Sequence, residues 1–396
     1  MKEVSIINSV PGNSGDLALL EALVYFLQEN TSSVSINIFS SAPSIIENAQ
    51  LKPSLNFFDI DKIYIQDSKG KFESIIKKIY LKFSSEEAML TNPFLFKSSK
   101  KLWWKAIQWS DYVVACPGGY LNEYYEIGAR LRVLENIVKK GSKLLFIGHS
   151  VGPFFTSNIT NRIQEVFKKS EAVVFRESIS FDRFKHVDMN SKFCPDIAFL
   201  LYKKYKDQLQ QHKAKNNKVV VNFRNWQYEK GGEDIIKKAA ETLDYINKEL
   251  DLDVDFLSTC QGLKDYTSDV KMAYIIKEKI RDPKRFNIID GYHSPKQLID
   301  KYAQYRFYVG MRMHGAILSL IANTPAFLIG YEKKSEGLFN DLKLEDYHVS
   351  MEESADTWIS RFKDVYERNL NESFSFKDQL IEVCLNIENT LKPLIK

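Results

Sequence analysis

The sequence lacks the features that mark secreted, metal-binding and membrane proteins. Its 396 residues include only four cysteines, at positions 116, 194, 260 and 384, without a CxxC pair. This pattern is typical of reduced thiols and argues against a disulfide framework or a zinc site. No apolar run reaches the roughly 18 uncharged residues that a membrane-spanning helix needs. The opening MKEVSIINSV suits a first strand better than a signal peptide. We therefore expect a soluble, cytoplasmic protein.

Signatures of nucleotide and nucleic-acid binding are also missing. Lys and Arg number 55 and Asp and Glu 51, and the resulting net charge of +4 is too small to indicate a nucleic-acid partner. The glycine-containing loops match neither the GK[ST] of a P-loop nor GxGxxG. Because no metal-ligand spacing is visible either, we expect no nucleic-acid partner, no metal and no cofactor.

What the sequence does contain is a regular alternation of short apolar runs and amphipathic helical runs. The strand candidates are EVSIIN, VSINIF, KIYIQ, DYVVACP, KLLFIG and AVVFRE, then VVVNF, VDFLS, FNIID, FYVG and AFLIG. This βαβα order predicts parallel sheets covered by helices. A polar, lysine-rich stretch at 202–218 divides the series. We therefore predict an α/β protein of two Rossmann-like domains facing a cleft, residues 1–203 and 217–396, closed by helices from about 355 to 395.

One segment, residues 69–109, departs from this alternation. It interleaves Lys with Phe, Ile and Trp, as in KGKFESIIKKIYLKF and FKSSKKLWWKAIQW. One interpretation is a helical excursion packed on the first domain with a solvated basic face. The other is an amphipathic surface for anionic lipid or a lipid-linked substrate, because Trp and Lys favour the membrane interface.

Several loops of the first half follow directly after strands. In PGNSGDLALLEAL, Asp16 is positioned to cap a helix beginning at Leu17, and the loop can present backbone N–H groups to an anion or a carbonyl oxygen. In ACPGGYLNE, Gly118 and Gly119 allow close backbone approach, and Asn122 and Glu123 follow near the expected cleft. Each stretch alone is equally compatible with a plain βα turn.

Polar residues also end other strands. His149 and Ser150 follow the strand in FIGHSVGPF, Arg176 ends the strand in VVFRES, and Arg224 ends VVVNF. Each arginine is compatible with an anion site or with a structural ion pair. His149 is compatible with a ligand contact or with a hydrogen-bonded loop histidine.

The most informative stretch is FYVGMRMHGAILSLIA. Arg312, Met313 and His314 lie where an apolar strand turns into an apolar helix, and Lys334 follows the next strand. A guanidinium, an imidazole and the free N–H groups of a helix suit a phosphate together with a carboxylate. The alternative is a buried Arg that binds backbone carbonyls.

Taken in order, these pieces resemble the polysaccharide pyruvyl transferase family from the amino terminus to about residue 342. The matching elements are Asn13-Ser14-Gly15-Asp16, Gly118-Gly119, Gly148–Pro153, Arg176–Ser180, Asp196–Phe199, Gly310–His314 and Tyr331–Lys334. The family pattern has Gln at 149, Gly at 117 and Ser at 315, where this chain has His, Pro and Gly. These departures leave the identity of the acceptor sugar open.

The resemblance implies a glycosyltransferase-B-like fold and transfer of a pyruvyl group from phosphoenolpyruvate to sugar hydroxyls as a ketal. The donor's carboxylate and phosphate would be held by these residues: Arg176, Arg224, Arg312, Met313, His314 and Lys334. His314 would act as general acid or phosphate contact, with Arg312 and Asp16 as the other catalytic candidates.

The acceptor side implied by the resemblance comprises Asn13, Asp16, Gly118, Gly119, Asn122, Glu123, His149 and Ser150. The acceptor would be a hexose of a capsular or exopolysaccharide precursor, lipid-linked at the inner membrane face, where the segment 69–109 would make a peripheral contact. The general base, the hydroxyl pair and the oligomeric state stay open. Alternatives are a nucleotide-sugar glycosyltransferase of the same fold, and a non-catalytic glycan-binding subunit that tolerates loss of Arg312 and His314.

Overall fold

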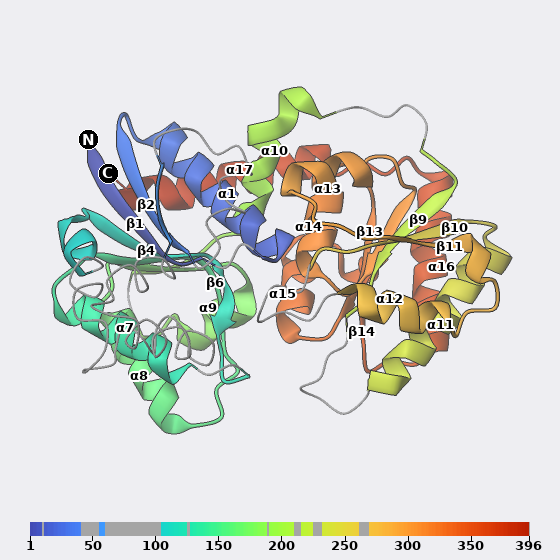
Figure 1. Cartoon of the computed structure of the whole chain (residues 1–396), viewed down its shortest axis with the longest axis horizontal. Coiled ribbons are helices and arrows are strands. Elements are labelled where there is room, and N and C mark those ends of the chain that lie inside the picture. The colour runs from blue at the N-terminus through green and yellow to red at the C-terminus, as the bar shows by residue number, and fades with distance from the viewer. Residues whose placement is uncertain are drawn as a thin grey trace, which may run out of the picture. The chain divides into compact units, whose positions relative to one another are not determined.

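The structure, a computed structural model, describes residues 1–9, 12–40, 55–59, 104–124, 127–187, 190–209, 215–224, 232–260 and 269–395. The chain forms two compact units, each with its own parallel sheet and helices (Figure 1). The first unit comprises Met1–Pro11, Leu19–Cys194 and Glu388–Lys396. The second comprises Gly12–Ala18 and Pro195–Ile387. The α/β architecture with two Rossmann-like sheets predicted from the strand and helix alternation is confirmed.

The sheet of the first unit has the strand order β3-β2-β1-β4-β6-β7-β8, and β5 pairs with β6. All of its described pairings are parallel. The strands are β1 (Lys2–Ser9), β2 (Val34–Ser40), β3 (Leu55–Asp59), β4 (Tyr112–Ala115), β5 (Gly118–Leu121), β6 (Leu144–Val151), β7 (Ala172–Phe175) and β8 (Ser191–Phe193). Helices within the described residues of this part of the chain include α1 (Ser14–Asn30), α7 (Gly128–Lys139), α8 (Ser157–Lys168) and α9 (Ser178–Phe184). Val, Ile and Phe dominate the central strands because these side chains fit a sheet that is buried on both faces.

Two local predictions in the first half were wrong. Helix α1 begins at Ser14 rather than at Leu17, and the Asn13 side chain, not that of Asp16, accepts the N–H of Gly15 at 2.9 Å. The Gly118–Gly119 stretch is not a turn, because it forms strand β5 beside β6. Two adjacent glycines do not indicate a strand, because glycine disfavours strands.

Most of the basic aromatic segment, residues 69–103, lies outside the described residues, as does the KIYIQ strand candidate. Of the rest, Trp104 packs against the hydrophobic core of the first unit. Trp109 is 69% exposed, and Lys105 Nζ lies 4.1 Å from its ring centroid. No helix within the described ranges is long and apolar enough to cross a membrane.

The sheet of the second unit is also parallel, in the order β11-β10-β9-β12-β13-β14. With the strands numbered from β9, this is the 3-2-1-4-5-6 order of dinucleotide-binding Rossmann domains. Its strands are β9 (Lys218–Asn222), β10 (Asp253–Leu257), β11 (Phe286–Ile289), β12 (Phe307–Gly310), β13 (Ala326–Gly330) and β14 (His348–Ser350). The crossover from β10–β11 to β12–β13 lies between β9 and β12, where ligands bind in open α/β sheets.

The helices of the second unit have clear sequence signals at their starts. Ser294 and Gln297 form a capping box before α13, and the side chain of Ser354 accepts the N–H of Thr357 at the start of α16. The helices are α10 (Leu200–Tyr205), α11 (Gly232–Glu249), α12 (Asp269–Lys277), α13 (Pro295–Tyr302), α14 (Met313–Ile321), α15 (Lys333–Asp341), α16 (Ala355–Asn371) and α17 (Lys377–Leu391), whose residues from Glu388 on belong to the first unit.

The closing helix α17 buries a narrower stripe than its apolar residues suggest. Leu380, Cys384, Ile387 and Leu391 are almost fully buried, whereas Ile381 is 45% and Leu385 49% exposed. The buried set recurs every three to four residues, as expected for one helix face.

Candidate active site

The carboxyl ends of β9 and β12 bring two arginines to one edge of the second sheet. The strands pair with Gly310 opposite Asn222, and the N–H of Met311 donates to the Asn222 carbonyl at 2.8 Å. Arg224 follows β9, and Arg312 occupies the N-cap position of α14. These two predicted donor residues are therefore neighbours by topology, at the point where the sheet order reverses.

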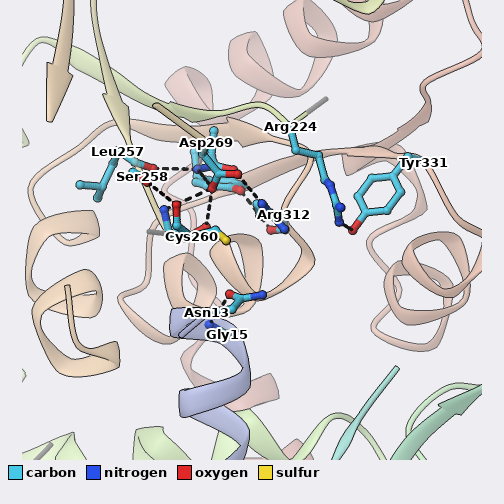
Figure 2. Close-up of polar contacts among 12 residues, drawn as sticks. Asn13, Gly15, Arg224, Leu257, Ser258, Cys260, Asp269, Arg312 and Tyr331 are labelled. Carbon is cyan, nitrogen blue, oxygen red and sulfur yellow. Dashed lines mark hydrogen bonds and ion pairs between the residues drawn. The ribbon is translucent and has the colours of Figure 1, made fainter. Parts of the chain in front are cut away.

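Arg312 forms a buried ion pair with Asp269, the first residue of α12 (Figure 2). The pair joins Arg312 Nη2 to Asp269 Oδ1, and their side chains are 10% and 1% exposed. The other carboxylate oxygen of Asp269 accepts from Asn222 Nδ2 at 3.3 Å and from Thr259 Oγ1 at 3.3 Å. Asp269 is thus the hub that fixes the guanidinium.

The electrostatics of Arg312 follow from this pairing. Burial lowers the pKa of its guanidinium, but the charge and hydrogen bond of Asp269, together with Tyr331 and Cys260, raise it above its ordinary value. Its Nε atom is buried with no hydrogen-bond partner. A buried donor without an acceptor is unfavourable by about 1–3 kcal/mol. An anionic ligand that accepts a hydrogen bond from this N–H would remove that unfavourable contribution.

The NSGD loop at the start of α1 is part of this same unit. Asn13 forms an antiparallel bridge with Cys260. The N–H of Ser14 donates to the Thr259 carbonyl at 3.0 Å, and its hydroxyl donates to the His293 carbonyl at 2.8 Å. Figure 2 shows Asn13 and Gly15 beside Cys260 and below Arg312. The first turn of α1 is therefore attached to the end of β10.

Gly15 packs directly against His314. A Cβ added to Gly15 would come within 2.8 Å of Cβ and Cγ of His314 and closer still to its Nδ1. Because atoms do not approach so closely, only glycine leaves the imidazole in this position. The glycine of the NSGD element thus has a structural explanation.

On its other side His314 faces Asp196. His314 Nε2 lies 3.5 Å from Oδ2 of Asp196, which is fully buried. Oδ1 of Asp196 accepts the N–H of Ala198 at 2.9 Å and so begins the short helix Ile197–Phe199. A carboxylate beside an imidazole orients the ring. His314 is 15% exposed in its side chain, so the ring is held on two sides and still reachable.

The remaining donor candidates of the second unit make local pairs. Arg224 Nη1 donates to the hydroxyl of Tyr331 at 3.0 Å, and its guanidinium lies 5.0 Å from that ring's centroid (Figure 2). Lys334 Nζ lies 2.6 Å from Glu332 Oε2, with side-chain exposures of 18% and 14%. Met313 is buried at the start of α14. Asp16 lies in the first turn of α1 and is half-buried.

The other predicted site residues belong to the first unit. His149, which is fully buried at the end of β6, has its pKa lowered to about 3, because burial disfavours the charged ring and Arg176 repels it. Its Nε2 lies 3.1 Å from the Tyr120 hydroxyl. Arg176 Nε donates to Ser150 Oγ at 2.7 Å. These residues form a buried polar network, and His149 is neutral in it near pH 7.

Asn122 and Glu123 fasten loops of the first unit. Asn122 Nδ2 donates to the Gly119 carbonyl at 2.7 Å, and its Oδ1 accepts the N–H of Tyr124 at 2.9 Å. The Glu123 carboxylate accepts the N–H of Thr156 at 2.9 Å as well as the Thr156 hydroxyl and the N–H of Phe155. The Thr156 hydroxyl bond is the largest cause that lowers the pKa of Glu123.

The structure thus brings together Asn13, Arg224, Arg312 and His314 around the β9 and β12 ends. Sequence reasoning missed Asp269, which lies 43 residues before Arg312 and outside any motif. It also gave no role to Asp196, although the D-x-A-F element contains it. A buried arginine implies a carboxylate partner, but the sequence alone does not say which.

Comparisons of the sequence with known proteins agree with these elements. The profile described as polysaccharide pyruvyl transferase matches residues 13–333. The amylovoran biosynthesis protein AmsJ of Erwinia amylovora is 24% identical over 373 residues, which cover 87% of each chain.

Solved structures show the same fold at low sequence identity. UDP-GlcNAc 2-epimerase of Methanocaldococcus jannaschii, in complex with UDP-GlcNAc and UDP, superposes with a TM-score of 0.61 at 12% identity, covering 100% of this chain and 99% of the other. The Neisseria meningitidis enzyme bound to UDP-GlcNAc gives 0.55 at 10% identity, covering 100% and 98%. The predicted glycosyltransferase-B-like fold is confirmed.

Proposed function

The chain belongs to the polysaccharide pyruvyl transferase family, and from this premise we propose that it transfers the pyruvyl group of phosphoenolpyruvate to two hydroxyls of one hexose. The hexose would belong to a precursor of a capsular or exopolysaccharide. The products would be a cyclic pyruvate ketal and inorganic phosphate. The likeness to an amylovoran biosynthesis protein supports a role in polysaccharide synthesis.

The observation that carries the proposal is the cationic edge of the second sheet. Arg312 keeps a buried N–H without an acceptor, Arg224 follows the neighbouring strand, and α14 begins directly after Arg312 with its positive dipole end. Phosphoenolpyruvate carries a carboxylate and a phosphate, and planar guanidinium groups suit both. We assign donor binding to Arg224, Arg312, His314 and Lys334, with Met313 contributing its backbone.

The chemistry requires one proton delivery and two hydroxyl additions. Protonation of the donor's methylene carbon makes its C2 electrophilic, and the first sugar hydroxyl adds there. The second hydroxyl then displaces phosphate from C2 and closes the ketal. One hydroxyl proton is balanced by the proton gained at the methyl group, and the other leaves with phosphate.

His314 is the proposed proton carrier, because its Nε2 faces the Asp196 carboxylate and Gly15 packs against the ring. Asp16, in the first turn of α1, is the proposed acceptor-side contact of this unit. The cations supply the charge stabilisation, so we propose that no metal or cofactor takes part. EDTA should then leave turnover unchanged, and a loss restored by added metal would contradict this assignment.

The proposal is tested by phosphate release from phosphoenolpyruvate in the presence of an extracted glycan acceptor, with the ketal methyl group followed by proton NMR. Wild type should form both products in equal amounts, and His314→Ala should form neither while its thermal unfolding stays unchanged. Near-normal turnover of His314→Ala would remove the proton-carrier role. Unchanged polysaccharide production by cells carrying Arg312→Ala and His314→Ala would favour a non-catalytic glycan-binding subunit.

The donor role of Arg176 and the acceptor roles of Asn13, Gly118, Gly119, His149 and Ser150 stay predictions. Peripheral membrane contact and a lipid-linked acceptor likewise stay predictions, because residues 69–103 lie outside the described part of the chain. Vesicle co-sedimentation of a variant with Trp103 and Trp104 replaced by Ala addresses the contact. Wild type should bind anionic vesicles, and the variant should not bind them.

A further inference from the structure

Two loops of the first unit are fastened together at the carboxyl ends of β5 and β6. The strands run parallel, with Leu121 opposite Val151. Beyond them, the N–H of Gly152 donates to the Leu121 carbonyl at 2.7 Å, and the N–H of Glu123 donates to the Pro153 carbonyl at 3.0 Å. The sheet pairing thus continues into the loops, past the point where the strands end.

The side chains of Asn122 and Glu123 complete this connection. Asn122 Oδ1 holds the N–H of Tyr124, and the Glu123 carboxylate holds the N–H groups of Phe155 and Thr156. The Thr156 hydroxyl also donates to Glu123. The Glu123 bonds hold Phe155 and Thr156 directly before α8, and the Asn122 bond holds the backbone just after β5.

The connection presents two aromatic rings. Tyr124 and Phe155 pack edge to face, with their centroids 5.6 Å apart. Phe155 is 67% exposed. A Phe left in water at the ligand-binding edge of an α/β sheet, with its backbone fixed, indicates a contact surface rather than a core residue.

We propose that Tyr124 and Phe155 form a stacking platform for the hexose ring of the acceptor glycan, an inference that rests on the proposed function. A pyranose exposes a face of C–H groups between its hydroxyl edges, and an aromatic face, which carries negative charge density, attracts such C–H groups. The same charge density disfavours the doubly anionic donor. The platform therefore recognises the uncharged sugar.

This assignment changes the role of two predicted acceptor residues. Asn122 and Glu123 act as positioning residues that hold the platform, since their polar atoms are used by backbone groups. Glu123→Ala should then raise the acceptor KM and leave the shape of the kcat–pH profile unchanged. Loss of the basic limb of that profile would instead mark Glu123 as the general base and contradict a positioning role.

The direct test is saturation-transfer NMR of the full chain with methyl β-D-galactopyranoside, methyl β-D-glucopyranoside and methyl α-D-mannopyranoside, without donor. Wild type should transfer saturation to the ring C–H protons of at least one hexoside. Phe155→Ala and Tyr124→Ala should lose about tenfold in affinity, and Phe155→Trp should retain it. Trp109→Ala, which removes a similarly exposed aromatic residue elsewhere on the unit, should bind as wild type.

Two outcomes distinguish this inference from the proposed function, and a third would show that a second copy of the chain covers the rings. Normal phosphoenolpyruvate binding with no hexoside binding, or equal hexoside binding by Phe155→Ala, overturns the platform alone. Hexoside binding that depends on Phe155 but no phosphoenolpyruvate binding supports the platform and overturns the donor assignment. Conversion of a dimer to a monomer by Phe155→Ala, seen by size-exclusion chromatography with light scattering, would show that the rings contact a second copy and would overturn the inference.

Discussion

Gly15 and His314 are in contact without space for another carbon atom between them. Gly15 lies in the first turn of α1 and His314 in the first turn of α14, and about 300 residues of sequence separate them. Gly15 therefore helps to set the position of the His314 imidazole.

Gly15→Ala should displace the imidazole or the first turn of α1. Such overpacking is unfavourable by about 1–3 kcal/mol, and we expect turnover to fall at least about tenfold because the ring loses its orientation. Gly128→Ala is the matched control, since a Cβ there meets only Arg132 Nη1 at 3.8 Å. Alanine in that helix should be neutral or stabilise by up to about 1 kcal/mol. Wild-type turnover of Gly15→Ala would show that the contact is irrelevant to the reaction.

Asp196→Asn should remove the negative charge beside His314 while leaving a polar group in the same place. The Asn oxygen can still accept the N–H of Ala198, which Asp196 binds at 2.9 Å, so we expect the fold to be kept. Without a carboxylate beside His314, kcat should fall by about 10²-fold, the lower end of what general acid–base catalysis contributes. The KM for phosphoenolpyruvate should change little. An equal fall of kcat in Asp196→Asn and in a distant Asp207→Asn control would contradict the role.

Asp269→Ala should destabilise the second unit strongly. It leaves the Arg312 guanidinium buried and unpaired, which is unfavourable by about 3–5 kcal/mol. The double variant Asp269→Leu with Arg312→Met should recover most of the free energy of unfolding but no activity. Asp182→Ala removes a carboxylate from an exposed pair with Lys185, with side-chain exposures of 62% and 55%. It should change stability by less than about 1 kcal/mol. Chemical unfolding compares the four, and equal stability of Asp269→Ala and wild type would contradict the hub role.

His149 makes stability depend on pH. Its pKa is lowered from 6.5 to about 3 in the folded state, by burial first and then by Arg176. Between these values the unfolded chain binds a proton that the folded chain does not. The free energy of unfolding therefore falls as the pH drops through this window, by up to about 1.4 kcal/mol per pH unit.

His149→Gln should remove this dependence while keeping a hydrogen bond to Tyr120. Urea unfolding at pH 7, 6 and 5 should show a shallower slope than wild type. Some slope should remain, because burial lowers the pKa of His348 to about 4 as well. A slope identical to that of wild type would mean that His149 is accessible to protons in the folded state.

Most strands and their parallel arrangement were readable from the sequence, because parallel strands buried on both faces require continuous runs of Val, Ile and Phe, but the order of the strands was not predicted. Arg224 and Arg312 could also be placed at strand ends, because each directly follows such an apolar run. Two kinds of feature were not. Asp269 reaches Arg312 only through tertiary packing, and no local pattern marks it. Glu123 was predicted as an acceptor contact near the cleft, and only the structure shows its carboxylate bound to Thr156 before α8.

Strand β5 shows a further limit. Two adjacent glycines disfavour a strand by propensity, and the β6 edge overrides this by supplying partners for their backbone. Helix α1 begins earlier than predicted for a similar reason. The chain from Asn13 to Gly15 is held by residues far away in sequence, which are Thr259, Cys260 and His314.

The most direct test of the donor assignment is a calorimetric titration of wild type and Arg312→Lys with phosphoenolpyruvate and, separately, with UDP. Phosphoenolpyruvate should bind wild type, and Arg312→Lys should bind it at least about tenfold more weakly because a lysine lacks the planar guanidinium fork. UDP should not bind. Binding of UDP without binding of phosphoenolpyruvate would contradict the account and favour a nucleotide-sugar transferase.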